Sequence, residues 1–132
     1  MKIPRTIFEQ LVAQAKNEAP LEACGILAGR NGAIEKFYPM TNIDHSSVHY
    51  RMAPREQFDV VKDIRAAGRK MLAIYHSHPK TPARPSAEDK RLAYTPGVIY
   101  LILSLQNAAG PAIQGFQIED GVVTEVPVEI SE

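Results

Sequence analysis

A short continuous apolar run, residues 71–74 (Met-Leu-Ala-Ile), leads directly into residues 75–79 (Tyr-His-Ser-His-Pro). An unbroken apolar run is typical of a strand buried on both faces, so this chain needs a sheet with helices packed against it. Because side chains alternate along a strand, one that continues through His78 places His76 and His78 on one face and turns Ser77 away. Two imidazoles on one rigid element supply two of the three protein ligands of a typical catalytic zinc site.

Asp89 is the candidate for the third ligand, brought back by the loop after the histidines. That loop contains Pro79, Pro82 and Pro85, which restrict its conformations and reduce the entropy lost on ordering it. The pattern Ser86-x-x-Asp89 also has an ordinary structural explanation, a helix start with a serine N-cap and an acid in the first turn. Such a helix turns Asp89 back toward the strand end, so capping and ligation are compatible. Two histidines two residues apart in a strand are, taken alone, more often ordinary partly buried residues than metal ligands.

Composition limits the classes of protein to which the chain can belong. The 132 residues suit one domain, 1–132, and the 15 basic residues balance the 15 acidic ones, whereas a nucleic-acid binder normally has a basic excess. The N-terminus shows no apolar signal segment and no run reaches the length of a membrane span. The single cysteine, Cys24, excludes an internal disulfide and a cysteine-rich metal site. We therefore expect a cytoplasmic protein that contacts neither nucleic acid nor membrane.

Helical and strand periodicities divide the rest of the chain. A first amphipathic helix is predicted to start at the possible capping box Thr6-x-x-Glu9 and to end before Pro20, and a second to run from about Pro54 to Gly68. Apolar and alternating patterns predict strands at 23–28, 34–38 and 98–103 and around Phe116 and Val122–Val128, with two-residue hairpin turns at Asn31-Gly32 and Asp120-Gly121. The order of elements predicts an α/β (mixed α+β) fold, with one mixed, largely antiparallel sheet and about three helices around it.

Residues 39–54 form a polar loop without periodicity, long enough to be functional or mobile. Asn42, Tyr50 and Arg51 in this loop are candidates for lining a substrate groove. His45 and His49 are expected to be solvated, and a second metal there is a minor alternative. Cys24 is expected to be a buried strand residue, because no base is placed beside it.

The spacing His76-Ser77-His78, seven residues, Ser86, two residues, Asp89 resembles the metal motif of the JAMM (MPN-type) zinc peptidases. The segment 20–29 around Glu22 is similar to the one that carries the catalytic glutamate of that family. The resemblance extends over most of the chain and implies a JAMM/MPN-like, cytidine-deaminase-like architecture. All five family positions are filled.

This resemblance implies a role for each of those residues. His76, His78 and Asp89 would bind one Zn²⁺ per chain, and a water would complete its coordination. Glu22 would act as general base and then as proton donor to the leaving amine. Ser86 would hydrogen-bond the oxyanion, an interaction worth roughly 3 kcal/mol in the barrier.

The family hydrolyses amide or isopeptide bonds that follow the C-terminal glycines of ubiquitin-like proteins. This short chain, without an appended binding module, resembles the small stand-alone prokaryotic branch, which trims the Gly-Gly tails of ubiquitin-fold sulfur carriers. The implied partner is a sulfur-carrier protein or its C-terminal adduct. An exposed strand edge is a suitable place to hold such an extended tail.

Three other functions remain open at the level of sequence. A non-catalytic MPN-like scaffold would lack ligand residues, which are all present here. A DNA-repair-associated relative shares a similar His-x-His and Asp pattern, but the neutral charge balance argues against it. A Ser-His-Asp hydrolase is disfavoured because Ser77 points away from the histidines and no Gly-x-Ser-x-Gly elbow exists.

Overall fold

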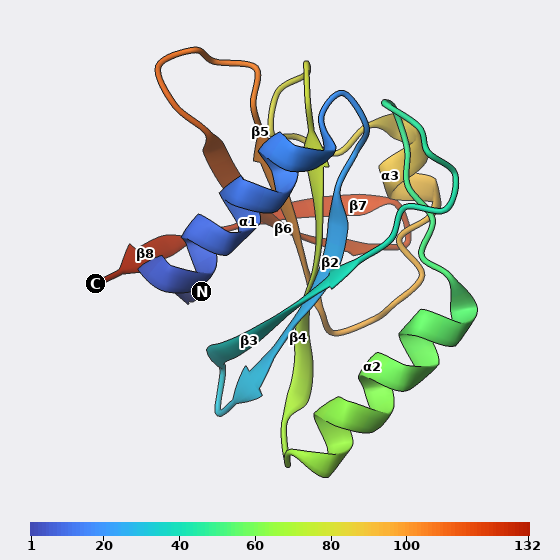
Figure 1. Cartoon of the computed structure of the whole chain (residues 1–132), viewed down its shortest axis with the longest axis vertical. Coiled ribbons are helices and arrows are strands. Elements are labelled where there is room, and N and C mark those ends of the chain that lie inside the picture. Colours follow the sequence, from blue (N-terminus) through green and yellow to red (C-terminus); the bar gives the residue numbers. More distant parts are fainter.

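A six-stranded mixed sheet forms the centre of the computed structural model, which describes residues 1–132 (Figure 1). Its strand order is β3-β2-β4-β5-β6-β7, and β4 with β5 is the parallel pair among antiparallel neighbours. The strands of this sheet are β2 (Cys24–Arg30), β3 (Ala33–Met40), β4 (Lys70–His78), β5 (Ile99–Ser104), β6 (Ala112–Glu119) and β7 (Val122–Val126). The helices are α1 (Arg5–Glu18), α2 (Pro54–Ala66) and α3 (Ala87–Arg91). The predicted α/β class with a largely antiparallel sheet is confirmed.

The two central strands bury alternate side chains on opposite faces, as the apolar runs predicted. On one face Ala73, Tyr75 and Leu101 join a cluster with Ile7 and Leu11 of α1. On the other face Ile26 of β2 and Ile64 of α2 belong to a second cluster. Tyr100 and Ile102 of β5 belong to a third cluster. Figure 1 shows α1 and α2 on opposite sides of the sheet. The strands are therefore covered on both faces, which fixes their register.

The two hairpins form at the predicted turns. Asn31 and Gly32 have φ values of 52° and 78°, and Asp120 and Gly121 have 51° and 76°. Positive φ at both central residues belongs to the type I′ turn, whose twist matches that of the flanking strands. Gly68, with φ 70°, follows α2 as predicted.

The predicted capping box at Thr6 is wrong. The helix α1 begins at Arg5 with Pro4 as its N-cap, and no side chain caps it. Thr6 therefore lies inside the first turn, where its backbone is already helical and its hydroxyl is not at the capping position.

A small second sheet at the chain ends was not predicted. Strand β1 (Lys2–Pro4) pairs in parallel with β8 (Glu129–Ser131), so the termini lie side by side next to α1 (Figure 1). The predicted strand from Val122 to Val128 ends at Val126, and the chain resumes as β8 only after Pro127. Proline provides no N–H for the ladder, which explains the break. None of the three helices combines the length and the apolar character that a membrane crossing requires.

One side-chain hydrogen bond joins β2 to β4 just outside the regular ladder. The Ser77 hydroxyl accepts from the Ala23 amide at 2.8 Å, while the Ser77 amide donates to the Ala23 carbonyl at 2.9 Å. Ser77 is fully buried and lies on the face opposite the histidines. The exchange fixes residue 23, and with it Glu22, beside the carboxyl end of β4.

We predict that Ser77→Ala destabilises the fold by about 1–3 kcal/mol, because the buried Ala23 amide loses its acceptor. The measurement is the free energy of unfolding in urea. Ser47→Ala is the matched control, since Ser47 is exposed, and it should change stability by less than about 0.5 kcal/mol. Equal stabilities of the two variants would contradict the assigned role of the Ser77 hydroxyl.

Candidate metal centre

Three ligand-type atoms converge at the carboxyl end of β4. The Nε2 atoms of His76 and His78 lie 3.1 Å apart, and Asp89 Oδ2 lies 3.2 Å from the first and 3.0 Å from the second. The histidines come from one face of β4, and Asp89 comes from the first turn of α3. The side chains of all three are buried, with 2%, 5% and 6% of their area exposed. The structure thus brings together the three residues singled out by spacing.

The hydrogen bonds around His78 decide what this cluster attracts. His78 Nδ1 lies 2.8 Å from the Pro82 carbonyl oxygen, which can only accept, so Nδ1 carries a proton. In the neutral imidazole Nε2 is then an acceptor, and it faces a carboxylate oxygen 3.0 Å away. Two acceptors at this separation repel unless a positive charge is shared between them. The cluster is therefore built to hold a cation or a proton.

The pKa values follow the same logic. Burial lowers the pKa of His76, which favours the neutral imidazole that binds metals. Burial also opposes charge on His78, but the hydrogen bonds to Asp89 and the Pro82 carbonyl prevail and raise its pKa. Burial works to raise the pKa of Asp89 as well, yet hydrogen bonds from both histidines hold it far below its ordinary value. Asp89 is an ionised acceptor at neutral pH.

The predicted Ser86 N-cap of α3 is confirmed, and it is part of a capping box that holds the Asp89 carboxylate in place. The Ser86 hydroxyl accepts from the Asp89 amide at 3.0 Å, and Asp89 Oδ2 accepts from the Ser86 amide at 2.9 Å. The cap uses an acceptor lone pair of the Ser86 hydroxyl and leaves its proton available for donation. Capping and convergence on the histidines thus coexist in one aspartate.

Glu22 lies just outside this triad. It is 3% exposed, and its Oε2 is 4.0 Å from His78 Nε2, while its Oε1 has no hydrogen-bond partner. Its backbone is held on both sides, because its amide donates to the Ser46 carbonyl and its carbonyl accepts from the Asn42 side chain. Burial raises the pKa of Glu22 to about 8. A positive charge among the three converging atoms would lower it again.

The donor set and its spacing fit zinc. Four tetrahedral ligands at about 2.0–2.1 Å from a zinc ion are separated by about 3.4 Å. The observed separations of 3.0–3.2 Å are close to that value. Two imidazoles and one carboxylate are ligands that zinc accepts in catalytic sites. A buried nitrogen, His76 Nδ1, has no hydrogen-bond partner.

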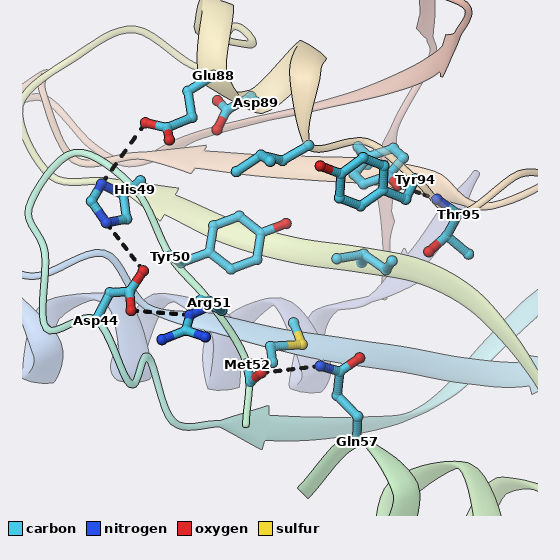
Figure 2. A pocket seen from close by; sticks show the side chains of 13 residues that line it. Asp44, His49, Tyr50, Arg51, Met52, Gln57, Glu88, Asp89, Tyr94 and Thr95 are labelled. Atoms are coloured by element: carbon cyan, nitrogen blue, oxygen red, sulfur yellow. Dashed lines mark hydrogen bonds and ion pairs between the residues drawn. The ribbon is translucent and has the colours of Figure 1, made fainter. Parts of the chain in front are cut away.

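A cavity of about 300 Å³ opens beside Asp89, between the loop 41–53 and α3 (Figure 2). Tyr50 and Arg51 line it, whereas Asn42 is buried inside the loop and bonds to its backbone. His45 is exposed. His49 is half-buried rather than solvated, since it lies 3.2 Å from Asp44 and 3.8 Å from Glu88 and so joins the loop to α3. No sequence pattern predicted this bridge, because the two elements are far apart along the chain.

Cys24 is a buried residue of β2, as expected. Its Sγ lies 3.8 Å from the Met40 carbonyl oxygen, and burial raises the pKa of the thiol to about 12. The thiol therefore stays protonated at neutral pH and is a poor nucleophile.

The chain is similar in sequence to a known protein family and to named peptidases. Residues 4–117 match the family model described as prokaryotic homologs of the JAB domain. The chain is 39% identical over 128 residues to the CysO-cysteine peptidase of Mycobacterium tuberculosis, covering 96% of this chain and 88% of the relative. It is 37% identical over 93 residues to the desampylase of Haloferax volcanii, covering 68% of this chain and 67% of that protein.

Solved structures share the fold. A protein from Desulfitobacterium hafniense, known from a solution structure, has a TM-score of 0.91 at 44% identity, over 100% of this chain and 94% of that one. A JAB1/MPN domain protein from Archaeoglobus fulgidus has a TM-score of 0.66 at 23% identity, over the full length of both chains. The JAMM/MPN-like architecture expected from the sequence is confirmed.

We predict that Asp89→Asn weakens zinc binding by more than about 100-fold, since loss of even a supporting residue around a metal typically costs 10–100-fold. Asparagine still accepts from the Ser86 amide, so the helix start is retained. Affinity is measured by competition with a chromophoric chelator. Lys90→Gln, the matched control on the same helix, should bind zinc as the wild type does, because Lys90 is exposed. Equal affinities of Asp89→Asn and the control would remove Asp89 from the ligand set.

Proposed function

The chain belongs to the prokaryotic homologues of the JAB domain and is a peptidase of the JAMM type, and from this premise we propose that it is a zinc peptidase of ubiquitin-like conjugates. It hydrolyses the amide or isopeptide bond that follows the C-terminal Gly-Gly of a ubiquitin-like protein. The substrate is a sulfur-carrier protein adduct. Residues 1–132 act as a single catalytic domain in the cytoplasm.

The observation that carries the proposal is the approach of Asp89 Oδ2 to both histidine Nε2 atoms within 3.2 Å, with the buried Glu22 carboxylate 4.0 Å from His78. A separate base beside a three-ligand cluster is the arrangement that metal-assisted amide hydrolysis needs. It disfavours the non-catalytic scaffold considered from the sequence.

His76, His78 and Asp89 would hold the zinc ion. When bound, zinc would polarise the scissile carbonyl and lower the pKa of a water molecule to about 7.

Glu22 takes the proton of the attacking water and later gives it to the leaving amine. Its position supports this two-way transfer, because the carboxylate is buried beside the cluster and its Oε1 has no hydrogen-bond partner. The backbone bonds to Ser46 and Asn42 keep the carboxylate at its distance from the cluster.

The Ser86 hydroxyl donates a hydrogen bond to the oxyanion that develops on the substrate carbonyl. The capping bond from the Asp89 amide fixes the oxygen without using its proton. A donor held in advance toward developing charge stabilises the transition state without reorganisation.

The substrate class is supported by relatives that act on carrier conjugates. Their names are CysO-cysteine peptidase, desampylase and, in Thermus thermophilus, probable TtuB-protein conjugate cleaving protease. These names divide between an amino-acid adduct and protein conjugates. The relative that matches over 96% of this chain is the amino-acid type, so we propose a carrier with a single amino acid or short peptide after Gly-Gly.

The first test incubates the zinc-loaded protein with ubiquitin-fold carriers that end in Gly-Gly-Cys or are joined through Gly-Gly to a lysine side chain. We expect mass spectrometry to show loss of the group after Gly-Gly, faster for the amino-acid adduct. The control is a carrier in which Ala-Pro replaces Gly-Gly before the same adduct, and it should stay intact. Absence of cleavage of every Gly-Gly adduct would refute the proposal.

The second test separates base from ligand. Glu22→Ala should reduce turnover by roughly 10²–10⁴-fold, the usual contribution of a general base, and should still bind zinc. His78→Ala should lose both zinc and turnover. Zinc content by mass spectrometry and rate of cleavage are measured on the same preparations. If Glu22→Ala loses its zinc, the assignment of Glu22 as a base outside the ligand set is wrong.

A further inference from the structure

The two histidines of the cluster are held in different ways. His78 donates from Nδ1 to the Pro82 carbonyl at 2.8 Å, the usual means by which a protein fixes the tautomer and ring orientation of a metal-binding histidine. His76 has no such bond, since its Nδ1 is buried without a partner. Its ring orientation must therefore have another source.

That source is an aromatic ring from the loop 41–53. The ring of Tyr50 stacks on the His76 imidazole, with centroids 4.7 Å apart and an angle of 25° between the planes. A near-parallel contact resists rotation of the imidazole about its Cβ–Cγ bond, because a rotated ring would strike the tyrosine face. The edge of the His78 imidazole also lies against the His76 ring, with centroids 4.9 Å apart and an angle of 62° between the planes.

We propose that Tyr50 is a positioning residue that keeps His76 Nε2 aimed at Asp89 and His78 by stacking, in place of the missing Nδ1 hydrogen bond. The inference rests on the proposed zinc site and adds to it a residue that touches a ligand without being one. It also gives the loop 41–53 a function in the metal centre.

The loop is built to hold this ring still. The Asn42 side chain donates to the His49 carbonyl at 3.0 Å and accepts from the Arg51 amide at 3.2 Å, which fixes the backbone on both sides of Tyr50. The Ile43 amide donates to the Arg51 carbonyl, and residue 42 forms a bridge with Met52. The same Asn42 donates to the Glu22 carbonyl, so one buried amide braces both the stacking ring and the proposed base.

The Tyr50 hydroxyl is separate from this contact. In Figure 2 the hydroxyl points along the cavity toward Tyr94. Burial raises the pKa of Tyr50, so the ring stays uncharged at neutral pH beside the Asp89 carboxylate. The stack therefore depends on the ring, whereas a substrate contact would depend on the hydroxyl. The Tyr50→Phe variant separates the two.

The experiment measures zinc affinity of the full chain by competition with a chromophoric chelator. We expect Tyr50→Leu and Tyr50→Met to bind zinc about tenfold more weakly, at the lower limit for outer residues of metal sites. Tyr50→Phe should stay within about twofold of the wild type, since it retains the ring. Tyr94→Leu is the matched control for zinc affinity, because Tyr94 lines the same cavity and has no stacking contact with a ligand.

A second measurement reports on the ring directly. The imidazole ¹⁵N resonances of His76 in zinc-free protein should shift in Tyr50→Leu and not in Tyr94→Leu, while urea unfolding shows that each variant is folded. Wild-type zinc affinity in both Tyr50→Leu and Tyr50→Met would overturn the inference and leave the proposed function intact. A wild-type protein that binds no zinc would overturn both.

Discussion

Mutual repulsion of three lone-pair donors is the constraint on which this structure depends. His76 Nε2, His78 Nε2 and Asp89 Oδ2 lie within 3.2 Å of one another in a buried site, where water does little to screen them. Such a cluster stays together only if its frame is rigid and a positive charge is present. The rest of the fold supplies the frame: a central strand covered on both faces, a capped helix start and a loop fastened by buried hydrogen bonds.

Each part of that frame performs two tasks. The alternation of β4 aims His76 and His78 at the cluster and turns Ser77 inward to hold Ala23 on the opposite face. Asp89 both closes the capping box and faces the histidines, so α3, with only five residues, is tied to the site it serves. A helix this short has little stability of its own. Its placement therefore depends on the same carboxylate that the cation requires.

The sequence was sufficient wherever a pattern is local. Unbroken apolar runs, Asn-Gly and Asp-Gly turns and the Ser86-x-x-Asp89 cap were predicted because neighbours along the chain determine them. The parallel β1–β8 pair was missed because it joins residues more than 120 positions apart. The false cap at Thr6 arose because the pattern alone does not show that the chain enters the helix through Pro4. No sequence pattern predicted the stacking of Tyr50 on His76, because the two residues are far apart along the chain and only the folded structure brings their rings together. Asn42, selected as a groove residue, lies inside its loop with its amide spent on the backbone.

The backbone around each carboxylate determines why Asp89 is the proposed ligand and Glu22 the proposed base. Asp89 and Glu22 are both buried carboxylates near His78, at 3.0 Å and 4.0 Å from its Nε2. Asp89 is drawn in because the helix start turns its side chain toward β4. Glu22 is held back because its amide and carbonyl are both bonded to the loop 41–53. The acidic residue that receives hydrogen bonds from histidine has a strongly lowered pKa, and the one that receives none has a raised pKa. Asp89 is thus held as an acceptor inside the cluster, whereas Glu22 is held outside it with one carboxylate oxygen free to take a proton.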